Sequence, residues 1–579
     1  MQKVFKIKFF FSLAGQAFLL LSLFILGSVF VLEANAQAET QLFNIDSYYD
    51  SYSRKEIEAE LIRTTDKLYF YAEKLWWNSL SYQEQNDMKI AFFELGEEFK
   101  NKIYPVLVSN FGSEPSPGIS GDERITVLIH PMFNEAGGYF NTGDAYSRYQ
   151  YPRSNERNIV YLNSRYINKP QSKSFLAHEF VHLITINQKD LLRNVTEEVW
   201  LNEARAEYAP TLLGYDDVYQ GSNLGKRVKD FLLKPSDSLT EWLNGKEDYA
   251  AANLFVQYLV DHYGRNILID SLQTNKTGID SINYALEKNG FKIDFSRVFS
   301  DWVVALLAND CELGGKYCYL NKNLKEFRLT PVFYYLPKTE TIWSTYYNTT
   351  YWSANWQRFI GGGNNLVLEF DGADSAGFEV PYLLCDYQNN CSVGFFPLDS
   401  GQKGQISFSE FSAKYSSLTI MPFIKSKTAG FNGREDSFSF SWKVSVQKET
   451  TGGENEDELI SRLSVQIEQL KRQIAEYQAK INAILANGSS FITCSEIKNN
   501  LYFGLKGNQE VSCLQEFLKN QGVEIYPEGL VTGNFFSLTR QAVIRFQEKY
   551  ASEILTPLGL IKGTGYVGQM TRDKINQTL

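Results

Sequence analysis

Two histidines lie four residues apart in the run Phe175–Ile184, and a glutamate directly follows the first of them. On a helix, residues with this spacing project from one face, so His178 and His182 can contact one metal ion. Glu179 then lies beside the ion without being a ligand, where its carboxylate can take a proton from an attacking water and pass it to a leaving amine. The run therefore predicts hydrolysis by a metal-activated water.

A short pattern of this kind also arises by chance on solvent-exposed helices, but its surroundings argue against that alternative. The chain has only four histidines, and half of them are in this run. The neighbouring side chains are apolar, namely Leu176, Phe180, Val181, Leu183 and Ile184. A helix this apolar is buried, so we expect the two histidines to be presented from a buried scaffold.

A second helical segment, Trp200–Ala209, can supply the third ligand. It begins 18 residues after His182. Glu203 can complete a His₂Glu site whose fourth position is left to water, as catalytic Zn²⁺ requires. Glu207 lies one turn later on the same face, where it can accept the free ring N–H of a ligating histidine. The expected cofactor is therefore Zn²⁺.

The two segments together carry a family resemblance. The pattern His178-Glu179-x-x-His182, followed by Trp-Leu-Asn-Glu-x-x-Ala-Glu-Tyr from Trp200, resembles the gluzincin metallopeptidases, and above all their hyicolysin-type branch. The resemblance covers about Lys67–Ala308. The resemblance implies that His178, His182 and Glu203 bind zinc and that Glu179 is the general base. It also implies that Glu207 accepts a supporting hydrogen bond from a ligating histidine.

Several other residues have alternative interpretations. Glu197 and Glu198 are rival third ligands on chemistry alone, but they precede the matching segment. Tyr249 occupies the place where aminopeptidase N-type gluzincins carry a tyrosine that stabilises the oxyanion, and the alternative is an ordinary core tyrosine. His130 and His262 are expected to be structural. The chain lacks the Gly-x-Met-Glu-Asn run with which aminopeptidase N captures a free amino terminus, and this favours an endopeptidase.

The elements that carry these residues are expected to form an α+β unit, residues 37–325, of gluzincin type. A mainly helical pattern runs over Asn44–Phe111, interrupted by a strand-like run at Lys67–Tyr71. Strands are expected at Arg124–His130, Gly138–Phe140 and Asn158–Asn163. Helices are expected at Ser172–Asn187, Val199–Leu213, Tyr249–Tyr263, Ile279–Lys288 and Phe295–Ala308. Gly138–Phe140 is a candidate edge strand for pairing with an extended peptide.

Beyond this unit the period of the apolar residues changes from helical to two. Residues 330–449 are expected to form an all-β sandwich that supports the catalytic domain or docks substrate. Its predicted strands include Leu366–Phe370, Ser417–Pro422 and Ser437–Val446. Residues 450–458 are a polar, acidic linker.

The segments after residue 458 are expected to be helical. Apolar residues in 459–486 alternate with spacings of three and four, which favours a parallel two-stranded coiled coil and a homodimer; a lone packed helix or a stalk is the alternative. Residues 492–579 are expected to be a small all-α domain. Its runs Leu505–Leu518, Gly529–Phe535, Thr539–Gln547 and Gly565–Thr571 resemble the peptidoglycan-binding domain of bacterial wall enzymes. The resemblance implies binding of wall glycan, and a structural or pro-domain role is the alternative.

The N-terminus and the cysteines indicate export, and the net charge argues against one class of partner. Basic residues, an apolar stretch and Ala34-Asn35-Ala36 predict a signal peptide over residues 1–36, with an uncleaved membrane anchor as the alternative. Six cysteines in close pairs predict three disulfides, Cys311–Cys318, Cys385–Cys391 and Cys494–Cys513. A net charge of −10 makes nucleic acid a poor partner.

Together these observations predict a secreted, wall-associated zinc metallopeptidase that hydrolyses polypeptides. Two alternatives are kept open. The first is a hydrolase of peptidoglycan cross-link peptides, which the C-terminal segment suggests. The second is a zinc-containing surface adhesin that has lost catalysis, which the intact His178–His182 pattern disfavours.

Overall fold

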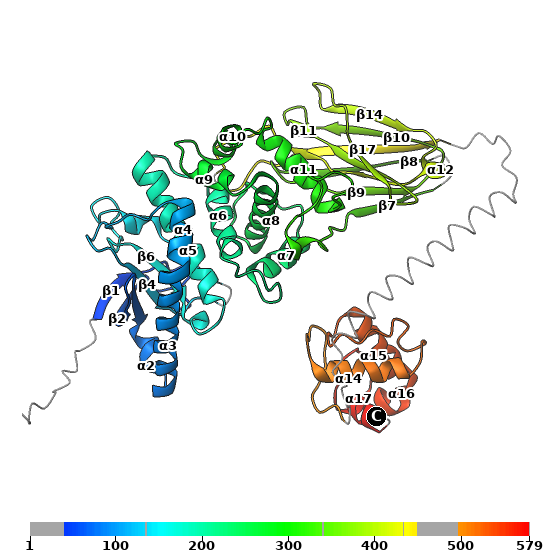
Figure 1. Cartoon of the computed structure of the whole chain (residues 1–579). Coiled ribbons are helices and arrows are strands. Elements are labelled where there is room, and N and C mark those ends of the chain that lie inside the picture. Colours follow the sequence, from blue (N-terminus) through cyan, green and yellow to red (C-terminus); the bar gives the residue numbers. More distant parts are fainter. Residues whose placement is uncertain (1–39, 134–135, 338–340, 432, 448–495, 578–579) are drawn as a thin grey trace, which may run out of the picture. The chain divides into compact units, whose positions relative to one another are not determined.

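The computed structural model describes residues 40–133, 136–337, 341–431, 433–447 and 496–577 (Figure 1). The chain divides into two compact units, Met1–Thr450 and Thr451–Leu579. The predicted signal peptide at 1–36, the linker at 450–458 and the coiled coil at 459–486 lie outside the described residues. The combination of helices with several separate sheets agrees with the expected multidomain α+β architecture.

The first unit begins with a six-stranded sheet. Its strands, in spatial order, are β1 (Thr40–Asn44), β2 (Glu56–Thr64), β3 (Leu68–Glu73), β4 (Ile125–His130), β6 (Ile159–Asn163) and β5 (Gly138–Tyr139). The pairs β3–β4 and β4–β6 are parallel, whereas β5 pairs antiparallel with β6 at the edge. Every residue of β4 and β6 is buried, as expected for parallel strands covered on both faces.

Helices cover this sheet and extend the unit. They are α2 (Lys74–Ser79), α3 (Tyr82–Glu98), the π-helical η1 (Phe99–Ile103), α4 (Tyr104–Phe111), α5 (Ser172–Ile186), α6 (Val199–Leu212), α7 (Asn223–Leu233), α8 (Lys246–Tyr263), α9 (Asn266–Leu272), α10 (Gly278–Lys288) and α11 (Phe295–Ala308). Ser81 and Glu84 form a capping box that starts α3. Helix α5 packs against β6, α4 and α6, so it lies in the centre of the unit.

The predicted helical pattern over Asn44–Phe111 is wrong in its first third. Residues 56–64 form strand β2, in which Ile57 and Ala59 are buried whereas Glu56 and Glu58 are exposed. This alternation has a period of two and is the mark of a strand with one buried face. The predicted strands near residues 124–130, 138–140 and 158–163 and the five predicted helices match observed elements, but α7 and α9 were not predicted.

The region after residue 330 is built from a four-stranded antiparallel sheet, a five-stranded mixed sheet and a two-stranded antiparallel sheet of β11 (Phe378–Glu379) and β16 (Phe423–Ile424). The four-stranded sheet has the order β14 (Lys403–Phe408), β10 (Asn365–Gly372), β17 (Phe438–Gln447) and β8 (Thr341–Thr349). The five-stranded sheet has the order β13 (Cys391–Phe395), β12 (Pro381–Asp386), β15 (Tyr415–Ile420), β9 (Gln357–Gly361) and β7 (Val332–Leu336), with β7 parallel to β9. Side chains of both sheets, such as Phe359 and Trp442, share one buried core, which makes this region a β-sandwich.

The β-sandwich is packed firmly onto the helical part of the same unit. Trp352 is 1% exposed, and its ring lies 4.8 Å from Phe295 and 5.2 Å from Phe299 of α11. Trp356 donates its indole N–H to the Val303 carbonyl at 3.1 Å. These aromatic contacts belong to the same core cluster as the helices.

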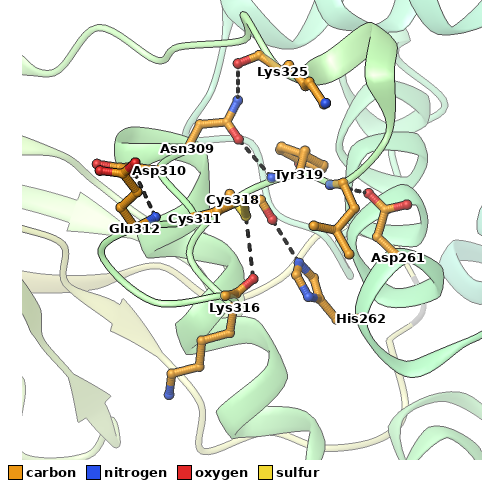
Figure 2. The surroundings of a disulfide bond; sticks show 12 residues. Asp261, His262, Asn309, Asp310, Cys311, Glu312, Lys316, Cys318, Tyr319 and Lys325 are labelled. Atoms are coloured by element: carbon orange, nitrogen blue, oxygen red, sulfur yellow. Dashed lines mark hydrogen bonds between the residues drawn. A yellow bond between two sulfur atoms is a disulfide. The ribbon is translucent and has the colours of Figure 1, made fainter.

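Two of the predicted disulfides are present, Cys311–Cys318 and Cys385–Cys391. Figure 2 shows the first, where the ring Nε2 of His262 hydrogen-bonds the Cys318 carbonyl at 2.7 Å. His262 therefore fixes the loop after α11, in line with its predicted structural role. Cys513 is also disulfide-bonded, and Cys494 lies outside the described residues.

The described part of the second unit is helical and contains an internal repeat. Its helices are α14 (Gln509–Asn520), α15 (Ser537–Lys549), α16 (Ala551–Ile554) and α17 (Gln569–Asn576). Gln515 receives backbone N–H groups from residues 17 and 18 positions later and donates to Thr539, 24 positions later. In the same way, Gln547 receives backbone N–H groups from residues 17 and 18 positions later and donates to Thr571, 24 positions later. The same helix–turn–helix unit therefore occurs twice, each time fixed by a buried glutamine.

The packing of Trp352 predicts a large stability effect. In Trp352→Ala, the lost ring leaves a cavity between the β-sandwich and α11, and the free energy of unfolding should fall by about 3–5 kcal/mol. Urea unfolding followed by circular dichroism measures this. The control Trp343→Ala removes a tryptophan that is 42% exposed, and it should change the free energy by about 0.5 kcal/mol or less. Equal effects of the two substitutions would contradict the proposed packing role.

Candidate metal centre

The ligand atoms of His178, His182 and Glu203 meet in one place. Helix α5 carries both histidines and α6 carries Glu203. The Glu203 oxygen Oε2 lies 3.2 Å from Nε2 of His178 and 3.5 Å from Nε2 of His182. One ligand atom from each of the three residues lies within 4.8 Å of the others. The structure thus brings together all three predicted ligands.

The hydrogen-bond partners of the two Nδ1 atoms indicate which ring nitrogens can bind a metal ion. His178 Nδ1 lies 3.5 Å from Glu207 Oε1, and His182 Nδ1 lies 3.1 Å from Asn202 Oδ1. Both partners are oxygen acceptors, so a neutral ring carries its proton on Nδ1 and leaves the Nε2 lone pair for a metal ion. Two nitrogen lone pairs and one carboxylate oxygen therefore face a common point, which is where a cation belongs.

This donor set fits Zn²⁺. Zinc takes imidazole nitrogen and carboxylate oxygen ligands, and catalytic sites use three protein ligands with one open position. The site also attracts positive charge strongly without a metal. Although burial opposes it, the Glu203 carboxylate raises the pKa of His182 to about 9. Protons and a metal ion therefore compete for the same lone pairs.

Glu207 is held as a carboxylate by an unusually complete set of donors. Arg227 donates to it through Nε at 2.9 Å and through a terminal nitrogen at 2.6 Å. Asn223 donates at 2.8 Å and Asn253 at 3.1 Å. Burial alone would raise the pKa of Glu207, but the Arg227 guanidinium lowers it below its usual value. Glu207 is thereby positioned to fix the ring of His178.

Glu179 lines the same cleft as the ligand His178, at the position that the sequence predicted for a general base. Burial raises the pKa of its carboxyl to about 7, and the two neighbouring histidines oppose this rise. A pKa near neutrality suits a group that must both accept and release a proton. A Cβ at Gly138 would lie 3.1 Å from Glu179 Oε1 and 2.5 Å from the Tyr161 carbonyl, so only glycine lets β5 come this close to the carboxylate.

The centre opens into a cleft of about 740 Å³. His178, Glu179 and Glu207 line it, together with Lys226 and Lys246 at α7 and α8. The remaining lining is rich in aromatic side chains, namely Tyr48, Tyr49, Phe133, Phe175 and Tyr249. The ligand residues are therefore accessible from solvent through a cleft lined by aromatic side chains.

Tyr249 lies in this cleft rather than in the core. Its ring is 6.4 Å from that of His178, and its hydroxyl donates to Asn244 Oδ1 at 2.9 Å. The Arg227 guanidinium lies 4.8 Å from its ring centre. The structure thus places Tyr249 with the predicted site residues.

The rival third ligands lie elsewhere. Glu197 is bound by two buried cations, Arg205 at 2.8 Å and Lys189 at 3.4 Å. Glu198 accepts the indole N–H of Trp200 at 2.8 Å and a backbone N–H from Gly430 at 2.8 Å. Neither belongs to the group of ligand atoms found among the described residues. Both glutamates therefore support the helix that carries Glu203.

Several contributors to the centre were not foreseen from sequence. Asn202 directly precedes Glu203 in the Trp-Leu-Asn-Glu run, and its position next to a ligand was an available signal. Arg227 and Asn223 lie on α7, and Asn244 precedes α8. No spacing rule links these residues to the histidines, because they approach the site only through the packing of α8 on α6 and of α7 on α8.

A His₂Glu set at the base of a cleft, with a further carboxylate beside it, is the arrangement of catalytic zinc sites in metallopeptidases. Over 223 residues the chain is 30% identical to the neutral metalloprotease ShpI of Staphylococcus hyicus, and the match covers 34% of this chain and 48% of that protein. The chain thus spans about half the length of this relative. The similarity supports a metalloprotease as the class of protein. No protein-family model matches the chain.

Solved structures offer only weak likenesses. The pre-peptidase C-terminal domain of a Bacillus anthracis collagenase is 8% identical with a TM-score of 0.14, covering 20% of this chain and 94% of that domain. The lysozyme inhibitor PliG of Aeromonas hydrophila is 11% identical with a TM-score of 0.15, covering 20% of this chain and all of that protein. Scores this low do not establish a shared fold. Among the described residues, none of the helices combines the length and apolar character that a bilayer span requires.

The environment of Glu197 predicts a stability loss. Glu197→Ala leaves Lys189 and Arg205 buried without their counter-ion, so the free energy of unfolding should fall by about 3–5 kcal/mol. Urea unfolding in the presence of a chelator measures this independently of metal binding. The exposed Glu94→Ala is the matched control and should cost about 0.5 kcal/mol or less. A loss below about 1 kcal/mol for Glu197→Ala would contradict the counter-ion role.

Proposed function

We propose that the chain is a zinc-dependent peptidase of gluzincin type that hydrolyses internal peptide bonds of proteins. The observation that carries this proposal is the convergence of two imidazole lone pairs and the Glu203 carboxylate on one point beside the buried carboxylate of Glu179. In this proposal His178, His182 and Glu203 hold the zinc ion. The relative named a metalloprotease supports the same reaction class.

The residues of the chain divide the chemistry among them. When bound, Zn²⁺ supplies Lewis-acid chemistry that acidifies a water molecule and polarises a carbonyl group. Glu179 takes the proton of the attacking water and delivers it to the leaving nitrogen. Glu207 and Asn202 hold the ligating rings in the required tautomer. Tyr249 stabilises the negative charge that develops on the carbonyl oxygen.

An extended substrate would add to the edge of the six-stranded sheet. Strand β5 is at that edge and pairs with β6 on one side only. An extended peptide can continue the sheet by main-chain hydrogen bonds, and Gly138 places this edge within reach of Glu179. Binding through the backbone suits an endopeptidase, because it does not require a free terminus.

We further propose that the enzyme is exported and held at the cell wall. The predicted signal peptide at residues 1–36 and the disulfides at Cys311–Cys318 and Cys385–Cys391 support an oxidising, extracellular location. The predicted coiled coil at residues 459–486 would allow two copies to associate. The C-terminal unit would then carry the wall contact.

The role of Glu179 gives a direct test. Glu179→Gln keeps the shape of the side chain but cannot accept a proton, so turnover of casein should fall by at least about a thousandfold. Metal analysis of the same preparation should still find one zinc per chain. A fully active, zinc-loaded Gln variant would refute the proposed base.

The same preparations separate the alternative functions. Purified wall is digested beside casein, and release of cross-link peptides without casein hydrolysis would replace the protein substrate by peptidoglycan. A wild-type chain that holds zinc but acts on neither substrate would indicate a catalytically inactive adhesin. Removal of zinc by a chelator should abolish whichever hydrolysis is observed, and readdition should restore it.

Exposed aromatic side chains support wall binding by the C-terminal unit. Tyr502 is 50% exposed, Phe503 58%, Phe536 41% and Tyr566 44%. Their rings form two pairs, Tyr502 with Tyr566 at 6.4 Å and Phe503 with Phe536 at 6.3 Å. An exposed apolar cluster of this kind marks an interaction surface, and flat rings suit the faces of sugar units.

This surface predicts a binding defect. Replacement of both Tyr502 and Tyr566 by alanine in the full chain should weaken cosedimentation with purified peptidoglycan by at least about tenfold, equivalent to about 1.4 kcal/mol. Ile561→Ala is the control, because Ile561 is 95% exposed and lies outside the ring pairs. Unchanged cosedimentation of the double variant would remove this surface as the wall contact.

A further inference from the structure

The loop between β1 and β2 brings a second tyrosine into the catalytic cleft. Tyr49 lines the cleft together with His178, Glu179 and Tyr249, although it is more than a hundred residues distant from them in sequence. No motif marked this residue, and the proposed mechanism does not use it. Its position therefore raises the question of what its hydroxyl does.

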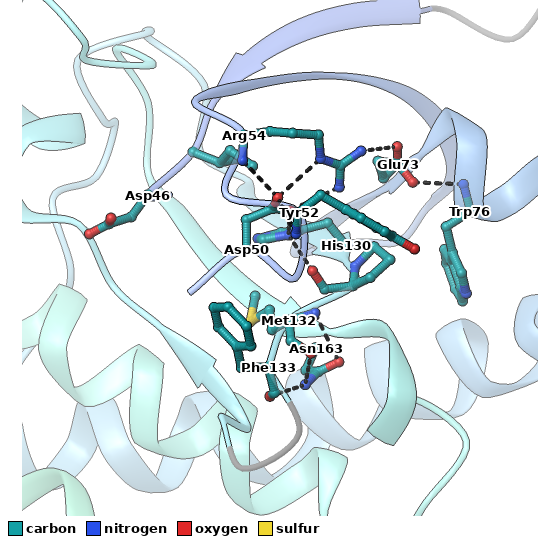
Figure 3. Close-up of polar contacts among 12 residues, drawn as sticks. Asp46, Asp50, Tyr52, Arg54, Glu73, Trp76, His130, Met132, Phe133 and Asn163 are labelled. Carbon is teal, nitrogen blue, oxygen red and sulfur yellow. Dashed lines mark hydrogen bonds and ion pairs between the residues drawn. The ribbon is translucent and has the colours of Figure 1, made fainter. Parts of the chain in front are cut away.

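The loop that carries Tyr49 is held in place by the buried ion pairs of the next residue. Figure 3 shows Asp50, which is fully buried, with Arg54 at 2.8 Å and His130 at 3.2 Å. Arg54 also bonds Glu73 at 2.7 Å. The backbone N–H groups of Tyr52 and Arg54 both donate to Asp50 as well. A loop anchored in this way presents the preceding residue in one orientation.

The ring of Tyr49 is fixed as well. It stacks on Tyr139 of β5 at 4.6 Å with an interplanar angle of 9°. Tyr139 stacks in turn on Tyr161 of β6 at 4.2 Å and 8°. The Tyr49 carbonyl accepts the backbone N–H of Phe133 at 3.1 Å. The three stacked rings join the loop to the sheet edge, so Tyr49 keeps its place relative to Glu179.

One amide group serves both tyrosines of the cleft. Asn244 Oδ1 accepts the hydroxyl proton of Tyr249 at 2.9 Å, and Asn244 Nδ2 donates to the Tyr49 hydroxyl oxygen at 3.5 Å. Asn244 itself has a left-handed backbone with φ of 62°, which non-glycine residues adopt at a cost and which clusters at functional sites. The amide is thus held between the two phenols by the local backbone.

This sharing leaves the two phenols in different states. An amide has one acceptor oxygen and one NH₂ group, so the phenol at the oxygen must donate its proton while the phenol at the NH₂ group keeps its own. Tyr249 must break its bond to Asn244 before it can donate to a substrate, whereas Tyr49 need not. Burial raises the pKa of Tyr49 to about 12, so the proton is present at neutral pH.

We propose that Tyr49 is a catalytic residue that donates a hydrogen bond to the carbonyl oxygen of the scissile peptide as that oxygen gains negative charge. The inference rests on the proposed peptidase function. A preorganised donor directed at developing charge stabilises the transition state more than the bound substrate. The ring of Tyr49 is fixed before substrate binds, and its hydroxyl proton is free to be donated.

Tyr49→Phe removes the hydroxyl and keeps the stacked ring. In zinc-loaded full-length protein, kcat for a peptide substrate should fall by about a hundredfold to a thousandfold with little change in KM. The affinity for a phosphinic peptide that mimics the transition state should fall in parallel, whereas zinc content and melting temperature should stay unchanged. Tyr52→Phe is the control in the same loop and should retain full activity.

A second variant tests the free proton without removing the phenol. Asn244→Asp replaces the NH₂ group by an acceptor, which Tyr49 would then bond, so kcat should fall by at least about tenfold although both tyrosines remain. Normal kcat and normal phosphinic-peptide affinity in Tyr49→Phe would overturn the inference and leave the role of Glu179 intact. An inactive zinc-loaded wild type would overturn the proposed function and this inference with it.

Discussion

Three lone pairs directed at one partly buried point are the constraint on which the rest of this structure depends. Such an arrangement is costly unless positive charge occupies the point, because the carboxylate of Glu203 is taken out of water. The surrounding residues maintain the arrangement rather than relieve it. Glu207 and Asn202 hold the protons on the outer ring nitrogens, and Arg227 keeps Glu207 charged. The protein thus stabilises a site that is complete only with a cation.

The helix that carries Glu203 is secured by a second buried charge cluster. Glu197 lies just before α6 and bonds both Arg205 of that helix and Lys189. The Lys189 ammonium also donates to the Ser271 carbonyl at 2.7 Å. Buried charges of this kind contribute little net stability, but they specify one arrangement of the elements that carry them. Here they specify how α6 lies against α5.

The two tyrosines of the cleft depend on different parts of the fold. Tyr249 comes from the start of α8, whereas Tyr49 comes from the first loop of the sheet. Asn244 joins them, and the stack through Tyr139 joins Tyr49 to the strand on which an extended substrate would pair. In the proposed function, the sheet edge that would pair with the substrate and the polar groups around its carbonyl are therefore joined to one another by these contacts.

The centre of this site could be read from sequence because its main residues lie within two helices. The spacing of His178 and His182 follows from helical geometry alone, and the downstream run places Glu203 and Glu207 on one face. The predicted disulfides at Cys311–Cys318 and Cys385–Cys391 were also accessible, since each closes a short loop. Strand β2 was misjudged as helix, because the prediction extended the helical pattern back to Asn44, whereas the first helix of the described residues begins only at Lys74.

Only the tertiary structure decided which distant side chains complete the site. Asn202, Arg227, Asn244 and Tyr49 reach it from four separate elements, and no local period connects them. The tertiary structure also excluded Glu197 and Glu198 as ligands, because each of them is bound by partners away from the metal centre. The sequence by itself determined the local geometry that spans one or two turns of helix. Packing decides which distant side chains complete the site. The free energy of burying a charge depends on its partners, and only the folded chain brings those partners together.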